Sequence, residues 1–318
     1  MRLKNSKYQL ILAPILGITD HIFRNIYNKH FSGFDYAIAP YIISNKKNEY
    51  KKSLLDRVRF ENNNLKTIPQ ILSNDAEQFI NLAKIFADMG HDEINWNIAC
   101  PYPRAIKKNL GSALLEKSDL INEILEKIND EKLNLNISIK LRLGLKSKED
   151  IFNVIPVLNN YPLKTVTIHP RTASQMYKGS VDLDILHKIT EKLNHEIIYS
   201  GDIKKVSDLK KFENNFPKIS TIMIGRGILI NPLLIDEMND IQYSNDERRN
   251  KLINYHKELL ETYSNYFSGD SHLLTRMKEI WFYQSEFFEN SNKLKKSIKK
   301  CKTLDSFENE ISNILNNV

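Results

Sequence analysis

The stretch EINWNIACPYP, residues 93–103, alternates apolar and polar side chains up to Ala99, as a buried β-strand does. It then reaches Cys100, and prolines follow at positions 101 and 103. A cysteine at the tip of a core strand gains a chemical role only in a fold that brings strand ends together. The segments on either side therefore decide how this stretch is interpreted.

Seven further β-like runs accompany this one, and amphipathic stretches such as residues 75–90 and 118–130 lie between them. Alternating strands and helices predict parallel pairing, and eight such units predict an α/β fold of the (β/α)8 TIM-barrel type. An open doubly wound sheet is the alternative, but the first strand–helix turn lacks a Gly-x-Gly-x-x-Gly motif. The eight runs are YQLILAP (8–14), YAIAP (36–40), TIPQIL (67–72), EINWNIA (93–99), NISIKLRL (136–143), TVTIHP (165–170), EIIYSGD (196–202) and TIMIGRG (221–227).

The β-like runs stop after Asn231-Pro232, and the sequence from about residue 240 onward has helical periodicity. We therefore predict a barrel catalytic domain over residues 1–238 and a small α-helical domain over residues 239–318. No Gly/Ser-rich linker separates them, so the two parts are expected to pack together.

The composition favours a polyanionic partner such as nucleic acid, because the net charge is +7 and the pI is about 9.1. General over-use of Lys, Asn and Ile explains the same charge equally well. The apolar stretch 10–18 is interrupted by Pro14 and Gly17 and is too short to span a membrane, and the N-terminus lacks the pattern of a secretory signal. We expect a cytoplasmic protein with free thiols at Cys100 and Cys301, no disulfide and no metal site.

Residues able to do chemistry stand at or just beyond the predicted strand ends, where active groups of such barrels gather. Glycines in SGDI (200–203) and GRGIL (225–229) predict a phosphate site. Lys140, Gln70 and His169 beside that site suit a flavin, because a cation near a reduced anionic ring contributes on the order of 4 kcal/mol at an effective dielectric near 20. A solvated lysine, a strand-end cap and a core histidine are the plainer interpretations of these three residues.

Together these motifs resemble those of the flavin-dependent dihydrouridine synthases, which reduce uridines in transfer RNA. The resemblance covers roughly residues 8–232, and TRMKEIWFY (275–283) extends it more loosely. This chain departs from the family pattern at Ile15, Ala99 and Ser200, and in the loop PYPRAIKKN (101–109). The matching motifs are APILGITDHIFR (13–24), NWNIACP (95–101), GSALL (111–115), IKLRLG (139–144), IHPRTASQMYKG (168–179), SGDI (200–203) and IGRG (224–227).

The resemblance implies FMN as cofactor, NADPH or NADH as reductant, tRNA as partner and Cys100 as the catalytic proton donor. We expect the protein to be a monomer. The implied FMN contacts are Pro14, Ile15, Leu16, Gln70, Lys140, His169, Ser200, Gly201, Asp202, Gly225 and Arg226. The expected RNA contacts are Asn97, Arg171 and Tyr177 near the base, and Lys107, Lys108, Arg276, Lys278 and the basic run 293–300 near phosphates.

The implied reaction is hydride transfer from reduced FMN to C6 of uracil, with a proton from Cys100 to C5. An ordinary thiol, with a pKa of about 8.5, is mostly protonated at neutral pH and can serve as that acid. The same chemistry on ribosomal RNA or a free pyrimidine, and a catalytically silent RNA-binding protein, remain alternatives. A buried structural cysteine is the plainest interpretation of Cys100. A cysteine hydrolase is disfavoured, since Pro101 lacks the N–H that often stabilises an oxyanion.

Overall fold

Ten strands form one sheet in the computed structural model, which describes residues 8–31 and 33–316. All neighbouring strands pair in parallel, in the order β3-β5-β6-β7-β8-β9-β10-β1-β2-β4. The strands are β1 (Gln9–Leu12), β2 (Tyr36–Ile38), β3 (Ile42–Ile43), β4 (Thr67–Ile68), β5 (Gln70–Leu72), β6 (Glu93–Ile98), β7 (Asn136–Gly144), β8 (Val166–Thr172), β9 (Ile197–Tyr199) and β10 (Thr221–Ile224).

The predicted run 67–72 closes this sheet into a barrel. Its first part, β4, pairs with β2, and its second part, β5, pairs with β6, so one segment joins the two ends of the strand order. Pro69 divides the run because proline has no N–H to donate to a neighbouring strand. The run was predicted as a single strand, which is wrong in this detail, and β3 was not predicted. The (β/α)8 barrel itself is confirmed.

Alternation along the strands separates two apolar cores. Ile11 and Met223 belong to a small cluster inside the barrel, whereas Leu10, Leu12 and Ile222 pack in the large cluster between strands and helices. Because successive strand side chains point to opposite faces, β1 and β10 contribute to both clusters at once. These strands therefore read as continuous apolar runs in the sequence.

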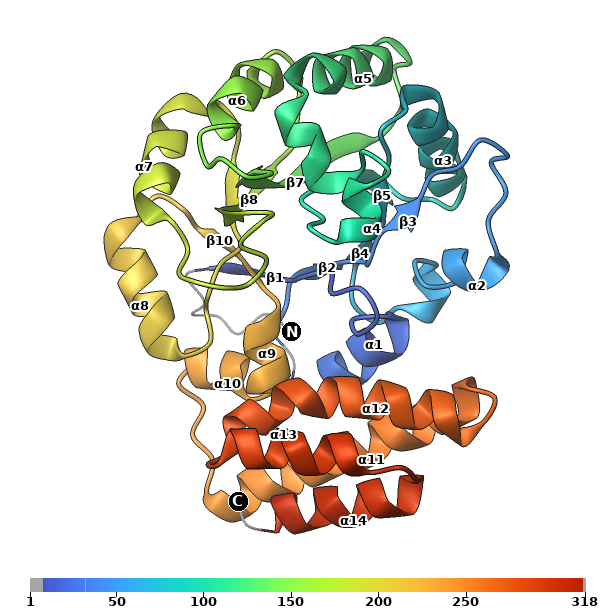
Figure 1. Ribbon diagram of the computed structural model, residues 1–318, viewed down its shortest axis with the longest axis vertical. Helices are drawn as coiled ribbons and strands as arrows, with labels where there is room; N and C mark the ends of the chain where they lie inside the picture. The colour runs from blue at the N-terminus through green and yellow to red at the C-terminus, as the bar shows by residue number, and fades with distance from the viewer. Residues whose placement is uncertain (1–7, 32, 317–318) are drawn as a thin grey trace.

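Helices surround the strands in the order expected for strand–helix units (Figure 1). Aspartates begin three of these helices: the carboxylates of Asp20, Asp75 and Asp182 accept the backbone N–H groups of Phe23, Gln78 and Ile185. The outer helices are α1 (His21–His30), α3 (Ala76–Asp88), α5 (Ser118–Asp130), α6 (Ile151–Asn159), α7 (Leu183–Lys192) and α8 (Val206–Asn215). Shorter elements in the loops are α2 (Lys52–Leu55), η1 (Phe60–Asn62), α4 (Pro103–Ile106), η2 (Gly111–Glu116), α9 (Arg226–Ile230) and α10 (Leu234–Met238).

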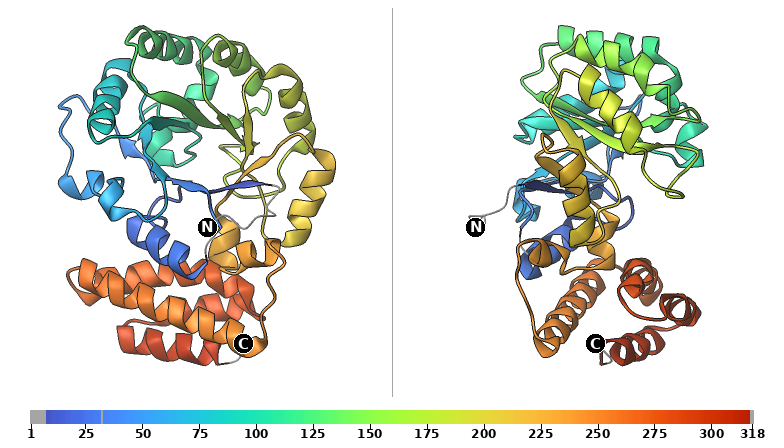
Figure 2. Two further views of the ribbon diagram at one scale, coloured as in Figure 1. Left: turned by 180° about the vertical axis from the view of Figure 1, so that it is seen from behind. Right: turned by 90° about the vertical axis from the view of Figure 1, so that its left-hand side faces the viewer.

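A helical region follows the barrel and lies beside α1, α9 and α10 (Figures 1 and 2). The Tyr27 hydroxyl of α1 donates to the carbonyl of Pro232, between α9 and α10. Lys29 and His30, at the C-terminal end of α1, donate to Glu258 of the helical region. The helical tail is confirmed, while the exact domain limits stay a prediction. Residues 1–7, for which no secretory signal is predicted, lie outside the described residues. The elements are α11 (Asn245–Tyr266), α12 (Asp270–Gln284), η3 (Ser285–Phe287), α13 (Ser291–Lys300) and α14 (Leu304–Leu315).

None of the helices in the described ranges is both long enough and apolar enough to cross a membrane.

Candidate active site

The loop from β1 to α1 holds Pro14, Ile15 and Leu16 at the barrel mouth. The Ile15 N–H donates to Thr19 Oγ1 at 2.8 Å, and that hydroxyl donates to the Ala13 carbonyl at 3.2 Å. Gly17 turns the chain with φ of +85°, a conformation that favours glycine. The segment APILGITD therefore encodes a fixed loop.

A row of buried amides supports the end of β6. Gln70 donates to Asn95 Oδ1 and accepts from Asn97 Nδ2, both at 2.7 Å. Asn97 Oδ1 in turn accepts the Ala99 N–H at 3.0 Å, one residue before Cys100. Gln70 thus lies beneath the site and fixes Asn97, and it does not line the hollow described next.

The inner hollow, our name for two adjoining compartments at the barrel mouth, gathers most of the predicted residues. Both compartments are lined by Pro14, Ile15, Tyr102, Lys140, His169 and Tyr177. One adds Ser200, Gly201, Asp202, Gly225 and Arg226, and the other adds Leu16, Tyr41, Asn97, Cys100 and Arg142. Cys100 and Lys140, though far apart in sequence, therefore face the same space.

Cys100 is 4% exposed and packs with Leu72, Ala105 and Leu110. Its Sγ lies 3.5 Å from the Tyr41 hydroxyl. Gly111, with φ of +62°, passes so close that a Cβ there would be 2.7 Å from Cys100 Cβ. The GSALL segment thus fixes the position of the cysteine.

Lys140 lies in the middle of β7, not at its end as predicted, because β7 continues to Gly144. Burial, followed by nearby Arg142, lowers the pKa of Lys140 to about 7. Among the described residues, none gives the ammonium a hydrogen bond or a carboxylate. Lys140 is therefore a buried amine whose positive charge no described carboxylate offsets.

His169 is held neutral at the floor of the inner hollow. Burial first, and then Arg142, Lys140, Arg171 and Arg226, lower its pKa well below the usual value. Its Nε2 lies 3.3 Å from Arg171 Nη1, and since a guanidinium only donates, Nε2 is the acceptor. The proton of the neutral ring is then on Nδ1.

Asp202 joins two arginines at the other end of the inner hollow. Its carboxylate accepts from both Nη atoms of Arg171, and from Arg226 Nη2 at 2.9 Å. Gly225 lies against Ala13 and Ile15, where a Cβ would be 3.1 Å from Ala13 Cβ. This end is therefore narrow and cationic, as a phosphate site requires.

The loop after β8 brings Tyr177 over the inner hollow. Arg142 donates to the carbonyls of Thr172 and Met176 at 2.9 and 2.7 Å, which fixes the loop. The Tyr177 ring is 41% exposed, and the Arg226 guanidinium lies 4.4 Å from its centroid. Tyr177 is thus accessible at the barrel mouth, and its contact with the base stays a prediction.

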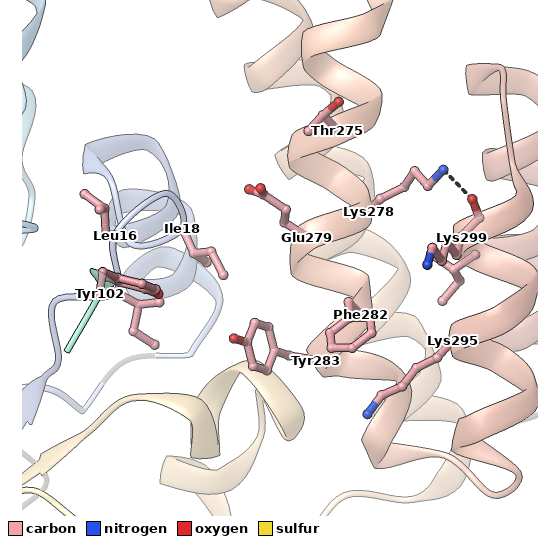
Figure 3. A pocket seen from close by; sticks show the side chains of 12 residues that line it. Leu16, Ile18, Tyr102, Thr275, Lys278, Glu279, Phe282, Tyr283, Lys295 and Lys299 are labelled. Atoms are coloured by element: carbon pink, nitrogen blue, oxygen red, sulfur yellow. Dashed lines mark hydrogen bonds between the residues drawn. The ribbon is translucent and has the colours of Figure 1, made fainter. Parts of the chain in front are cut away.

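A second, larger cavity of about 550 Å³, the outer groove, lies between the barrel mouth and the helical region. Figure 3 shows Leu16 and Tyr102 on the barrel side facing Glu279 and Tyr283 of α12. Tyr102 and Tyr283 also line the inner hollow, so the two spaces lie next to each other. The other lining residues are Ile15, Ile18, Thr275, Lys278, Phe282, Lys295, Ile298 and Lys299.

Besides Asn97, which the amide row holds, three predicted RNA contacts have other partners inside the protein. Arg171 is 1% exposed and bound to Asp202 and the Gly179 carbonyl. Arg276 forms an ion pair with Asp20. Lys278 donates to the carbonyl of Lys299 at the end of α13 (Figure 3) and to the carbonyl of Cys301.

Lys107 and Lys108, at the end of α4, are exposed, and their ammonium groups have no partner within the described ranges. Of Lys107, Lys108, Arg276 and Lys278, these two are the ones that the fold leaves available, and Lys293, Lys296, Lys299 and Lys300 of the basic run 293–300 are exposed as well.

Sequence reasoning missed several residues of the site. Arg142 stands in the quoted motif IKLRLG, and its alternation with Lys140 places both on one face of the strand. Tyr102 stands in the loop 101–109, which differs from the family pattern, and Gly111 is the first residue of the quoted motif GSALL. Tyr41 carries no local signal, because only the fold brings it to Cys100.

Comparison with known proteins agrees with this geometry. A family model described as dihydrouridine synthase (Dus) matches residues 11–318. The tRNA-dihydrouridine synthase B of Pasteurella multocida (strain Pm70) is 28% identical over 267 residues, which cover 81% of this chain and 79% of that protein. The protein of the same name from Escherichia coli (strain K12) is 26% identical over 233 residues, covering 72% and 71%.

Solved structures show the same fold. Morphinone reductase superposes with a TM-score of 0.52 at 9% identity, over 73% of this chain and 85% of that one. The old yellow enzyme homologue from Zymomonas mobilis gives 0.52 at 11% identity, over 76% and 91%. At these identities the likeness concerns the barrel alone. The family model, in contrast, spans nearly the whole sequence, and the chain belongs to the dihydrouridine synthase family.

Proposed function

We propose that this protein reduces uridine to 5,6-dihydrouridine in tRNA, with FMN as cofactor and NADPH or NADH as reductant. The observation that carries the proposal is the meeting of the Cys100 thiol and the unpartnered Lys140 in one hollow. Relatives named tRNA-dihydrouridine synthase B support the substrate.

The inner hollow suits FMN at both ends. Lys140 has no carboxylate partner among the described residues, and an electron-rich ring would offset its charge. Arg226 with the glycines of the SGDI and IGRG segments suits a phosphate. Pro14, Ile15 and His169 would border the ring. When bound and reduced, the flavin supplies the hydride that C6 of the uracil ring accepts.

The chain's own residues would position the base and move the proton. Cys100 gives the thiol proton to C5, and the buried amide row beneath it fixes Asn97 at the same wall. Tyr177 and Tyr102 border the space and exclude water from it. Proton transfer to C5 requires that the Cys100 thiol is protonated before each turnover.

The outer groove would admit the RNA to the site. A stacked uridine must leave its helix to reach the barrel mouth, at a cost of a few kcal/mol. Exposed Phe282 offers a ring for stacking, and Lys107, Lys108 and Lys299 offer charge for phosphates. We therefore assign RNA binding to the helical region, residues 239–318, together with the loop around α4.

The test is an assay of the purified flavin-loaded protein with a nicotinamide nucleotide and an unmodified tRNA transcript. We expect nucleosides digested from the tRNA to contain dihydrouridine by mass spectrometry. Ribosomal RNA fragments and free uridine serve as competing substrates. Dihydrouridine formed only in one of those substrates would replace the proposal, and a protein that binds no flavin would refute it.

A further inference from the structure

Tyr41 stands directly behind the sulfur of Cys100. Its hydroxyl lies 3.5 Å from Sγ, within hydrogen-bond range for sulfur, and both residues line the inner hollow. Of the described side chains, Tyr41 is the one that forms a hydrogen bond with this thiol. The contact therefore joins Cys100, the proposed acid, to the Tyr41 hydroxyl, which has no role in the mechanism described above.

The backbone holds Tyr41 firmly in this place. It follows Pro40 and directly precedes β3, where Ile42 pairs with Ile71 of β5. Just beyond β3, Ser44 Oγ donates to Ser73 Oγ at 2.7 Å. Because the segment is fixed to β5 on its far side, the backbone that carries the phenol is held in place beside Cys100.

The phenol of Tyr41 stays protonated during the proposed reaction. Burial, and then its contact with Cys100, raise the pKa of Tyr41 above the usual range. A protonated phenol can donate to a sulfur anion, whereas a neutral thiol accepts only weakly. The contact therefore favours the state of Cys100 that exists after its proton has been given away.

We propose that Tyr41 is a positioning residue that holds Cys100 Sγ toward the base and stabilises the thiolate formed during uridine reduction. This rests on the proposed function, since it concerns the acid of that reaction. The Cys100 S–H bond breaks as the C5–H bond forms, and the electron pair stays on sulfur. Solvent then returns a proton to the sulfur, and Tyr41 keeps its own.

Other titratable groups face Cys100 as well. Lys140 and Arg142 of β7 and His169 of β8 line the same compartment, and Tyr102 follows two residues along the chain. Arg142 carries a positive charge, whereas burial lowers the pKa of Lys140 to about 7 and keeps His169 neutral. These groups remain in a Tyr41→Phe variant, so a comparison with wild type isolates the hydroxyl.

The experiment measures alkylation of Cys100 by iodoacetamide against pH, in a Cys301→Ser background so that one thiol reacts. Loss of the Tyr41 hydroxyl should move the alkylation profile to higher pH by about one unit, the expected effect of a hydrogen bond to a charged group. Tyr102→Phe, which removes a hydroxyl from the same hollow, should leave the profile unshifted. Circular dichroism and flavin content check that each variant is folded.

The second measurement is the steady-state kinetics of uridine reduction by the same variants. Tyr41→Phe should lower kcat about tenfold and leave KM for tRNA within about twofold, since phenylalanine preserves the shape of the wall. An unshifted alkylation profile overturns the assignment of Tyr41 even in an active enzyme. A shifted profile in a protein that forms no dihydrouridine refutes the proposed function instead, because alkylation needs no RNA.

Discussion

Arg276 of α12 donates to the carboxylate of Asp20 at 3.0 Å, which joins the helical region to the loop that borders the inner hollow. Asp20 also begins α1 and accepts from the Tyr263 hydroxyl at 2.8 Å. The Arg276 guanidinium lies over the rings of Tyr263 and Phe267. This arginine, expected at RNA, is thus part of the contact between the two regions.

Arg276→Ala should therefore destabilise the protein. Asp20 is left buried with one fewer donor, and the expected loss is roughly 1–3 kcal/mol in the free energy of unfolding. Urea unfolding measures it. Lys107→Ala is the control: it should leave stability unchanged but weaken RNA binding and reduce its salt dependence. If Arg276→Ala instead weakens RNA binding and leaves stability unchanged, Arg276 is an RNA contact after all.

Contacts between residues far apart in the sequence could not be predicted, whereas features of single strands could. The eight β-like runs were predictable because each buried strand shows its own apolar pattern, although Pro69 divides one of them and β3 has no such pattern. The role of Cys100 came from the family resemblance, and Lys140 was expected at a strand end although it lies in the middle of β7. Arg276 and Asp20 are 256 positions apart, and Tyr41 and Cys100 are 59 apart. No local pattern signals such a partner, so a charge that the fold neutralises was interpreted as free for RNA.

The lowered pKa of Lys140 predicts a pH dependence of stability. Between pH 7 and about 10.5 the unfolded chain holds the lysine proton and the native protein does not, so the stability of the flavin-free protein rises with pH. The slope should reach at most about 1.4 kcal/mol per pH unit. Urea unfolding from pH 7 to 9 measures it, below the range in which tyrosines titrate. Lys140→Met should lose this slope, and a slope equal to wild type would contradict the prediction.

Gly111→Ala should displace Cys100. The residue has φ of +62°, and a Cβ would lie 2.7 Å from Cys100 Cβ and 2.8 Å from its carbonyl oxygen. We expect a loss of stability above about 1 kcal/mol, together with faster alkylation of Cys100 as the thiol becomes exposed. Gly269→Ala is the matched control, since φ is +94° there with nothing within 4 Å. Because Gly269 has φ of +94° and ψ of 145°, the control should also lose stability through backbone strain, without changing the reactivity of Cys100.

Cys100→Ala should separate binding from chemistry. The substitution removes one sulfur from a wall that Leu72, Ala105 and Leu110 complete, so flavin content and RNA affinity should stay near wild type. Turnover should fall about 10²–10⁴-fold, the usual contribution of a general acid. Single-turnover formation of dihydrouridine is the measurement. A variant that keeps wild-type turnover would remove Cys100 from the mechanism.

Phe282→Ala should weaken RNA binding without affecting the fold. The ring is 47% exposed in the outer groove, with the Lys295 ammonium 4.7 Å from its centroid. Loss of a stacked base costs about 1–3 kcal/mol, so the Kd for tRNA should rise about 5- to 150-fold. Phe60→Ala, 46% exposed in η1 and outside the groove, controls for the loss of an aromatic ring. Equal effects from the two variants would show that the RNA does not enter through the outer groove.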